Sequence, residues 1–233
     1  KMMAIVTTGN GGYEKLEYRE APIPVPRPGE VLLRVLAAGV NNTEINTRLG
    51  WYSSSVTADT SATAEIQEGD TQQKTDGGWN GATPFPLIQG TDCCGVVSQL
   101  GESVSKELLG KRALVRACMR PNGHNVMDNV WMASDFDGAF AEFVRVPASE
   151  VFPVVSDWSN EELATIPCAY GTAENMLHRA AVRAGDVVLV AGASGGVGSA
   201  AVQLATRRGA IVAAITSKEK IEQIRALGVD VII

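Results

Sequence analysis

The feature that most constrains the fold of this chain is a glycine-rich turn, residues 191–198, which follows an apolar run and precedes a run of small residues. The run Val-Val-Leu-Val-Ala before the turn is typical of a strand buried on both faces of a parallel sheet. The elements expected around the turn are strand 186–191, helix 196–208, strand 211–215, helix 218–227 and strand 229–233. This β-α-β-α-β order predicts right-handed crossovers and a doubly wound parallel sheet, of which this chain carries only the first half.

The turn itself predicts a binding site for the diphosphate of a dinucleotide, as in a Rossmann-type sheet. It fits the pattern [G/A]-x-G-x-x-G with Ala193, Gly195 and Gly198 at the small positions. Missing side chains let backbone N–H groups approach the diphosphate, and the helix N-terminus adds positive potential. The predicted cofactor-binding residues here are Ala193, Ser194, Gly195, Gly196, Val197 and Gly198. The alternative is a tight packing turn, which also favours glycine.

The end of the second strand indicates which dinucleotide binds. A carboxylate is expected there for NAD, but the chain has Thr216 and Ser217, followed by Lys218 and Lys220. Hydroxyl donors and cations suit a ribose 2′-phosphate, so Thr216, Ser217 and Lys220 favour NADPH as the cofactor. The alternative is that Ser217 caps a helix whose lysines lie on a solvated face.

The first 155 residues show a different pattern, short β-rich runs separated by glycine and proline, which predicts a small, partly open β-barrel. The expected strands are residues 2–6, 16–19, 30–38, 94–100, 111–117 and 139–146. Asn41 and Glu44 are spaced to cap a short helix reciprocally, ending near Gly50. Further helices are expected over residues 160–165 and 172–182.

Residues 53–83 interrupt this pattern, because they are rich in Ser, Thr, Asp, Gln and Gly and have few apolar residues. Such a segment buries little surface to offset its ordering entropy. We interpret it as a long inserted loop, mobile or acting as a flap over a substrate cleft.

Composition excludes several classes of protein. Among the 233 residues, 20 Lys and Arg stand against 26 Asp and Glu, a net charge of −6, which argues against nucleic-acid and anionic-membrane partners. No apolar run approaches the roughly 18 residues that span a bilayer. The four cysteines, Cys93, Cys94, Cys118 and Cys168, form no C-x-x-C pair, so we expect reduced thiols and a cytoplasmic protein.

A set of short motifs resembles the medium-chain dehydrogenase/reductase superfamily over nearly the whole chain except residues 53–83. The motifs are Gly29-Glu30-Val31-Leu32, Ala38-Gly39-Val40-Asn41, Gly90-Thr91-Asp92, Gly95-Val96-Val97, Gly138-Ala139-Phe140-Ala141-Glu142-Phe143, Gly171-Thr172-Ala173 and the glycine-rich turn. The resemblance implies a GroES-like, partly open β-barrel domain over residues 1–155, which binds substrate. It implies the N-terminal half of a Rossmann domain over residues 156–233.

The branch within the superfamily depends on zinc. Zinc alcohol dehydrogenases have a Cys after the Gly-Val step, a Gly-His-Glu motif, and a Cys four residues before a Thr. This chain has Asn41 at the first position and Thr91-Asp92 at the second, and only Cys168 matches. One thiolate does not hold a catalytic zinc, so we expect no metal site and the zinc-independent, quinone oxidoreductase-like branch.

In that branch the resemblance places Asn41 and Tyr52 at the site where nicotinamide meets substrate. A second tyrosine of the family falls at Asn46, and Thr172 matches the residue beside the nicotinamide ring. Asn41, Asn46 and Tyr52 are therefore the expected hydrogen-bond donors for negative charge on the substrate oxygen. The alternatives are that Asn41 only caps its helix and that Tyr52 is a surface aromatic residue.

The function expected from these features is hydride transfer from NADPH to a quinone or an activated C=O or C=C group of a small molecule. Two alternatives remain: a zinc alcohol dehydrogenase using Cys168, Asp92 and Cys93 or Cys94, and a non-catalytic nucleotide-binding relative. His178, within a predicted helix, is expected to be structural. The resemblance implies a homodimer in the complete protein.

Overall fold

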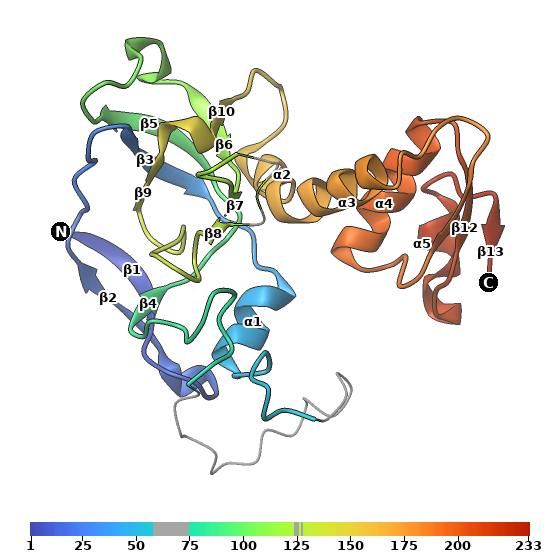
Figure 1. Cartoon of the computed structure of the whole chain (residues 1–233), viewed down its shortest axis with the longest axis horizontal. Helices are drawn as coiled ribbons and strands as arrows, with labels where there is room; N and C mark the ends of the chain where they lie inside the picture. The colour runs from blue at the N-terminus through green and yellow to red at the C-terminus, as the bar shows by residue number, and fades with distance from the viewer. Residues whose placement is uncertain (58–74, 124–125, 127) are drawn as a thin grey trace. The chain divides into compact units, whose positions relative to one another are not determined.

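A computed structural model describes residues 1–57, 75–123, 126 and 128–233 and divides into two compact units (Figure 1). Unit 1 is Lys1–Thr165 and unit 2 is Ile166–Ile233. Helix α2 (Asn160–Ala164) belongs to unit 1 because it packs against strands β3 and β5. In the sequence, the division between the units therefore falls ten residues after the predicted domain boundary at residue 155. Most of the predicted flap, residues 58–74, lies outside the described residues.

Unit 1 is built from short strands. They are β1 (Met2–Thr7), β2 (Leu16–Ala21), β3 (Glu30–Ala37), β4 (Leu87–Ile88), β5 (Cys94–Leu100), β6 (Arg112–Val115), β7 (Cys118–Met119), β8 (Val130–Trp131), β9 (Phe143–Pro147) and β10 (Val151–Pro153). The order β10-β6-β5-β3-β9 forms the large antiparallel sheet, and β2-β1-β4 and β7-β8 form two smaller ones (Figure 1). Among the described residues, the short 3₁₀ helices Tyr13–Lys15, Lys106–Leu108 and Ala148–Glu150 lie between strands.

The large sheet and the β1 sheet are joined by residues 138–142, so the barrel is partly closed. The sequence predicted a strand from residue 139, but β9 begins only at Phe143, because the preceding residues bond to other elements. Gly138 N–H donates to the Ile88 carbonyl, and Ile5 N–H donates to the Phe140 carbonyl. A Cβ on Gly138 would lie 2.5 Å from the Gly90 carbonyl oxygen, so this crossing requires glycine.

The core of unit 1 lies between the sheets and consists of apolar side chains with almost no exposure. Leu33, Val97, Val115, Met132 and Val146 are among its members. Buried residues alternate with less buried ones along β6 and β9, as expected for strands of a half-buried barrel. Helix α1 (Asn42–Arg48) follows β3 and turns Glu44, Thr47 and Arg48 inward.

Unit 2 is a parallel sheet with helices on one face. Its elements are α3 (Pro167–Arg179), β11 (Val187–Val190), α4 (Gly196–Arg207), β12 (Ile211–Ala214), the 3₁₀ helix Lys218–Lys220, α5 (Ile221–Arg225) and β13 (Val231–Ile232). The strand order is β11-β12-β13, all parallel. Helix α3 begins five residues earlier than predicted, because Pro167 suits a first turn that needs no N–H. None of the described helices is long and apolar enough to cross a bilayer.

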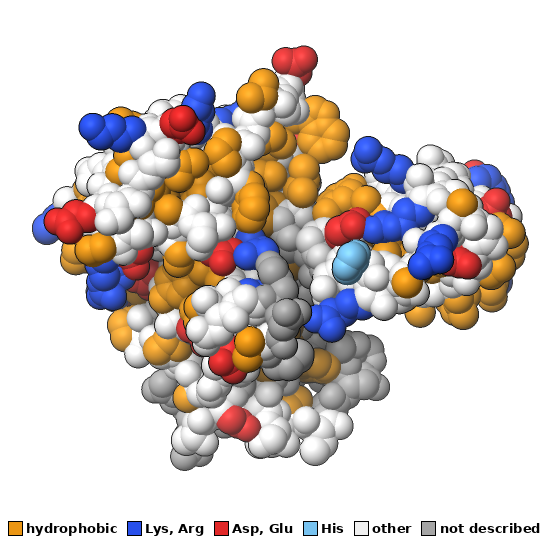
Figure 2. Space-filling view, turned by 45° about the horizontal axis from the view of Figure 1, so that its top comes forward, with side chains coloured by type: hydrophobic (Ala, Val, Ile, Leu, Met, Phe, Trp, Pro, Cys, Tyr) orange, Lys and Arg blue, Asp and Glu red, His pale blue; other side chains and the backbone are white. Residues whose placement is uncertain are grey.

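The sheet of unit 2 is buried on one face only. Val190, Val212 and Ala214 pack in a core with α3, α4 and α5, whereas Val187 is 72% and Leu189 60% exposed. Hydrophobic side chains accordingly reach the surface of this unit (Figure 2). Burial of these strands on both faces is therefore not seen among the described residues, because the described helices all pack into the same core.

Candidate functional site

A buried polar cluster lies where α1 begins and the loop before β5 passes it. We define it by Asn41, Glu44, Gln89, Thr91 and Asp92, of which all but the half-buried Asn41 are at most 5% exposed. The Asn41 side-chain amide donates to Asp92 Oδ2 at 2.9 Å and to Thr91 Oγ1 at 3.2 Å. These three side chains come from segments 50 residues apart, so only the fold brings them together.

Glu44 is the centre of this cluster. Its Oε1 accepts hydrogen bonds from Thr91 Oγ1 at 2.5 Å and from Thr91 N–H at 2.8 Å. Its Oε2 accepts from Asn41 N–H at 2.7 Å and from Thr43 Oγ1 at 3.2 Å. The capping box predicted for Asn41 and Glu44 forms, and the same carboxylate also fixes the Thr91 loop.

The network continues to the first strand. Gln89 Nε2 donates to the Glu44 carbonyl at 3.1 Å, and Thr7 Oγ1 donates to Gln89 Oε1 at 2.9 Å. Thr7 is 1% exposed. Each of these buried polar groups thus has a partner, which is what makes their burial tolerable.

The chemistry of the cluster does not suit zinc. At the positions where zinc enzymes have Cys and His, this chain has the Asn41 amide and the Thr91 hydroxyl; the amide donates to that hydroxyl and to Asp92. Structural and catalytic zinc ions take thiolate, imidazole and carboxylate ligands. Burial raises the pKa of the Cys93 thiol, and burial raises that of Cys94 although Arg112 opposes it, so neither is a ready thiolate.

Of the other two predicted catalytic residues, Asn46 lies on α1 and Tyr52 lies just after it. The Tyr52 ring lies 5.3 Å from that of Trp79, which stacks on Trp131 at 4.9 Å. Tyr52 is 36% exposed, and its hydroxyl has no hydrogen-bond partner among the described residues. Asn46 is half-buried, and its backbone carbonyl accepts from Trp51 N–H at 2.8 Å.

The glycine-rich turn forms the second candidate site, at the carboxyl edge of the sheet in unit 2. Ala193 N–H donates to the Ile215 carbonyl at 3.1 Å, which joins the turn to the end of β12. Helix α4 begins at Gly196, and no side chain of the described chain caps it. Its first N–H groups have no partner within the helix and are available to an anion.

The glycines of this turn serve two different purposes. A Cβ on Gly198 would lie 2.2 Å from the Gly192 carbonyl oxygen, so Gly198 is required by packing. A Cβ on Gly195 or Gly196 would approach no atom closer than 3.5 Å, and both residues are exposed. Protein packing alone does not require glycine at these two positions, whereas a diphosphate lying against the backbone does.

The residues predicted to hold the ribose phosphate lie at the same edge. Thr216 N–H donates to the Ile233 carbonyl, and Thr216 Oγ1 is buried without a hydrogen-bond partner in the described chain. Ser217 and Lys220 are exposed. The backbone N–H of Glu219 and the Ser217 hydroxyl hold the pKa of the Glu219 carboxyl below its ordinary value, so a carboxylate stands beside Ser217.

Thr172 and His178 both lie exposed on α3. The start of α3 is near the turn, because a Cβ on Gly196 would lie 3.7 Å from Ala169 Cβ. His178 is in the last turn of α3 and is not part of the core.

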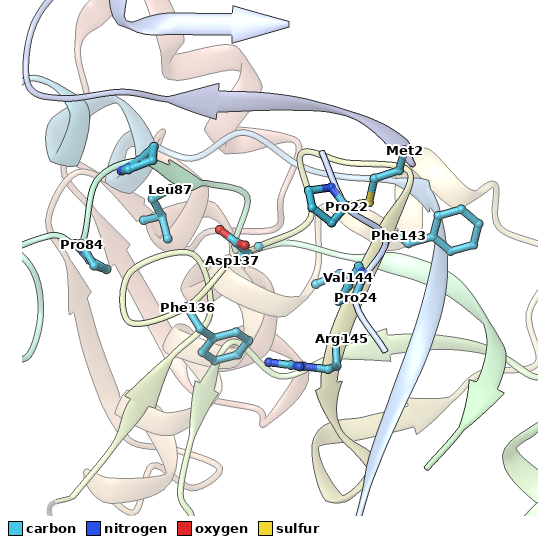
Figure 3. A pocket seen from close by; sticks show the side chains of 12 residues that line it. Met2, Pro22, Pro24, Pro84, Leu87, Phe136, Asp137, Phe143, Val144 and Arg145 are labelled. Atoms are coloured by element: carbon cyan, nitrogen blue, oxygen red, sulfur yellow. The ribbon is translucent and has the colours of Figure 1, made fainter. Parts of the chain in front are cut away.

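A pocket of about 270 Å³ in unit 1 contains none of the predicted residues (Figure 3). Its lining is mostly apolar and comes from β1, the proline-rich segment after β2, the segment before β4, and β9: Met2, Pro22, Pro24, Pro84, Pro86, Leu87, Phe136, Gly138, Phe143 and Val144, with Asp137 and Arg145. Asp137 Oδ1 accepts from Ile88 N–H, and Arg145 pairs with Glu30 at 3.2 Å. Both charged groups already have partners, so this pocket carries no chemistry.

Sequence reasoning missed the central role of Glu44 and Thr91. The spacing of Asn41 and Glu44 signals a capping box but not a contact with residues 50 positions later. Trp79 and Trp131 carry no signal at all for their stacking with each other, because it depends on how two loops meet.

The described residues thus form a β-barrel with a buried polar cluster, and a parallel sheet that carries a glycine-rich turn. Residues 27–156 match the family model for the alcohol dehydrogenase GroES-like domain. The chain belongs to the medium-chain dehydrogenase/reductase superfamily, which confirms the predicted family and fold class.

Solved structures and curated relatives agree with this assignment. A protein from Sinorhizobium meliloti 1021, provisionally named an alcohol dehydrogenase, is 38% identical with a TM-score of 0.82, covering 100% of this chain and 62% of that one. The quinone oxidoreductase of Coxiella burnetii is 27% identical with a TM-score of 0.75, covering 100% and 62%. The mouse synaptic vesicle membrane protein VAT-1 homolog-like is 31% identical, covering 88% of this chain and 38% of its own length. The chain therefore spans less than two thirds of each of these relatives.

Proposed function

We propose that the protein is an NADPH-dependent oxidoreductase that reduces a quinone or an activated C=O or C=C group of a small molecule without a catalytic zinc. The observation that carries the proposal is the turn before α4, where Gly195 and Gly196 leave the backbone open at an uncapped helix N-terminus. The unpartnered Thr216 hydroxyl at the same sheet edge supplies a further group for a dinucleotide.

The residues of this chain hold the cofactor in distinct ways. The first N–H groups of α4 bind the diphosphate, and Thr216 binds the adenosine ribose. Ser217 and Lys220 bind a 2′-phosphate, because a hydroxyl and an ammonium group both donate to phosphate oxygens. Thr172 lies on the helix whose start is near the turn and contacts the nicotinamide part. When bound, the nicotinamide supplies the hydride.

The buried polar cluster supports a reaction without zinc. With Asn41 and Thr91 hydrogen-bonded to each other, negative charge on the substrate oxygen requires hydrogen-bond donors instead of a metal. Tyr52 and Asn46 are the candidates, since neither side chain has a hydrogen bond to a described residue. The Tyr52–Trp79–Trp131 stack provides an aromatic surface beside the Tyr52 hydroxyl, which suits a planar substrate ring.

The test is a fluorescence titration with NADPH and NADH, followed by assay of quinone reduction and metal analysis of the purified protein. We expect NADPH to bind about tenfold more tightly than NADH, and Lys220→Ala to remove most of that difference. Lys111→Ala, which removes an exposed lysine of unit 1, is the matched control and changes neither affinity.

Three outcomes would contradict parts of the proposal. Stoichiometric zinc that is lost together with activity would assign a zinc alcohol dehydrogenase. Tight NADPH binding without oxidation of NADPH by any quinone or enone would assign a non-catalytic binding protein. Equal affinity for NADH in the wild type would overturn the choice of NADPH.

A further inference from the structure

We infer that Glu44 is a positioning residue, which acts through Thr91 to hold both N–H groups of the Asn41 side chain away from the substrate. Asn41 then orders the site without donating to the reacting oxygen. The role in the reaction rests on the proposed function, whereas the orientation of the Asn41 amide does not.

The first step is the set of hydrogen bonds that Glu44 accepts. Four groups donate to its carboxyl group, two at each oxygen: Thr91 O–H and N–H at Oε1, and Asn41 N–H and Thr43 O–H at Oε2. Both carboxyl oxygens therefore act as acceptors.

The second step fixes the proton of Thr91. Glu44 Oε1 is the acceptor in the 2.5 Å contact with Thr91 Oγ1, so the threonine donates this hydrogen bond. Thr91 Oγ1 has given up its one proton to this bond. Towards Asn41 it is therefore an acceptor only.

The third step fixes the Asn41 amide. Thr91 Oγ1 at 3.2 Å and Asp92 Oδ2 at 2.9 Å both contact the same end of the amide, and both are acceptors. Only the NH₂ end satisfies two acceptors, so the chemistry of the partners decides the orientation of a side chain whose N and O atoms are otherwise hard to tell apart. Both N–H groups are thereby engaged within the protein.

The consequence concerns the chemistry of the site. A developing oxyanion is stabilised by donors directed at it, and an amide with both N–H groups engaged has none to offer. The donor role expected for Asn41 from the sequence therefore passes to Tyr52 or Asn46. Replacing the Glu44 carboxylate by an amide frees the Thr91 proton to turn towards Asn41, which removes the constraint on the Asn41 amide.

A second capping box in unit 1 provides a matched control. At the start of α2, Ser159 N–H donates to Glu162 Oε2 at 2.8 Å, and Glu162 N–H donates to Ser159 Oγ at 3.1 Å. Glu162 is exposed and holds no buried hydroxyl. Glu162→Gln thus alters a capping box in the same way as Glu44→Gln, but it breaks no hydrogen bond to a buried threonine.

The decisive measurement is the hydrogen-exchange rate of the Asn41 side-chain NH₂ protons by NMR, without cofactor or substrate, their signals being identified by their loss in Asn41→Asp. We expect Glu44→Gln and Thr91→Val each to speed exchange about tenfold, because each breaks the bond that orients the amide. Thr91→Ser, which keeps the hydroxyl, and Glu162→Gln are expected to leave it unchanged. Equal rates in Thr91→Val and Thr91→Ser would overturn the inference, and this pair decides even where Glu44→Gln does not fold.

The role in the reaction is tested by steady-state kinetics on the same variants with NADPH and a quinone. We expect kcat to fall about 10- to 100-fold in Glu44→Gln and Thr91→Val, with KM changed less than about threefold and Thr91→Ser near the wild type. An unchanged kcat in variants whose amide exchange has risen would overturn the positioning role. Absence of turnover in the wild type would instead reject the proposed function and leave the NMR result intact.

Discussion

The two candidate sites of this protein are built in opposite ways. At the turn of unit 2, Gly195 and Gly196 are exposed, and the important property of these two residues is the absence of a side chain. In the buried polar cluster of unit 1, side chains from segments about 50 residues apart satisfy one another out of contact with water. The first site is prepared for a ligand, and the second is complete in itself.

This difference determines how each site responds to substitution. A substitution in backbone that is open to a ligand mainly lowers the affinity for the ligand. A substitution in a fully hydrogen-bonded network lowers the free energy of unfolding, because it leaves a buried group without its partner. The variants below are chosen to test that distinction, and each has a counterpart in which the effect should vanish.

The largest effect is expected within the turn itself, at Gly198. A methyl group there would overlap the Gly192 carbonyl oxygen at 2.2 Å, so Gly198→Ala is expected to destabilise unit 2 by about 3 kcal/mol or more. Denaturant unfolding followed by circular dichroism measures this loss.

Gly195→Ala is the counterpart, because its Cβ would have 3.5 Å of space and its φ of −77° suits any residue. Its unfolding free energy should change by less than about 1 kcal/mol. Its NADPH affinity should fall about tenfold or more, because the methyl group displaces the diphosphate from the N–H groups. A Gly195→Ala protein that binds NADPH like the wild type would show that the open turn is not the binding site.

The second effect tests the saturation of the cluster. Asn41→Asp places a carboxylate 2.9 Å from Asp92, and one of the two acids must then keep a proton, which raises its pKa in the folded state above the unfolded value. Stability that depends on such a proton is present at low pH and lost as pH rises. We expect Asn41→Asp to be destabilised by about 2 kcal/mol more at pH 8 than at pH 5.

Asn80→Asp supplies the comparison, since the Asn80 amide donates to Asp135 Oδ2 at 2.7 Å but is exposed. Solvent screening should keep its pH-dependent loss below about 0.5 kcal/mol. Similar pH profiles for the two variants would mean that burial of the cluster has no energetic consequence.

The third effect concerns the edge of the turn, where side chains do take part. Glu219 stands beside Ser217 and repels a 2′-phosphate, so Glu219→Gln should raise NADPH affinity about threefold and leave NADH affinity unchanged. Glu222→Gln, one helical turn further on and paired with Arg225, should change neither. A gain for both cofactors would place Glu219 near the diphosphate instead of the ribose.

The smallest effect is expected at Asp76, whose carboxylate accepts hydrogen bonds from hydroxyl and N–H groups as Glu44 does but is not buried. The Ser53 and Ser54 hydroxyls and Ser54 N–H lower the pKa of Asp76 to about 2 from 3.8, so its stabilising contribution is present above pH 4 and fades as pH falls towards 2. NMR titration of the Asp76 carboxyl should show this midpoint. Ser53→Ala or Ser54→Ala should move the midpoint upwards, and an unchanged value would remove these hydroxyls as the cause.

The local sequence pattern was sufficient to predict an element where its structure depends on residues adjacent in the sequence. Strand β5 has the predicted bounds, 94–100, and α1 begins at the predicted capping box. The turn between β11 and α4 also follows from its own residues, since glycines and a helix start are adjacent.

Prediction failed where distant segments compete for the same backbone groups. Residues 139–142 have strand character, but their N–H and C=O groups bond to β1 and to the residues around Gly90, so β9 starts later. The predicted burial of β11 was likewise greater than the structure shows, since Val187 and Leu189 are exposed. An apolar run in the sequence does not indicate whether other elements cover both faces of the strand.

The amino-acid sequence by itself determined the family of the protein, the order of its elements and the open glycine-rich turn, since each of these depends on residues next to one another. Only the tertiary structure decided that Glu44 fixes Thr91 and that Thr91 and Asp92 engage the Asn41 amide. The reason is geometric: hydrogen-bond direction depends on which acceptors surround a donor, and in this cluster the acceptors lie about 50 residues further along the chain, between β4 and β5.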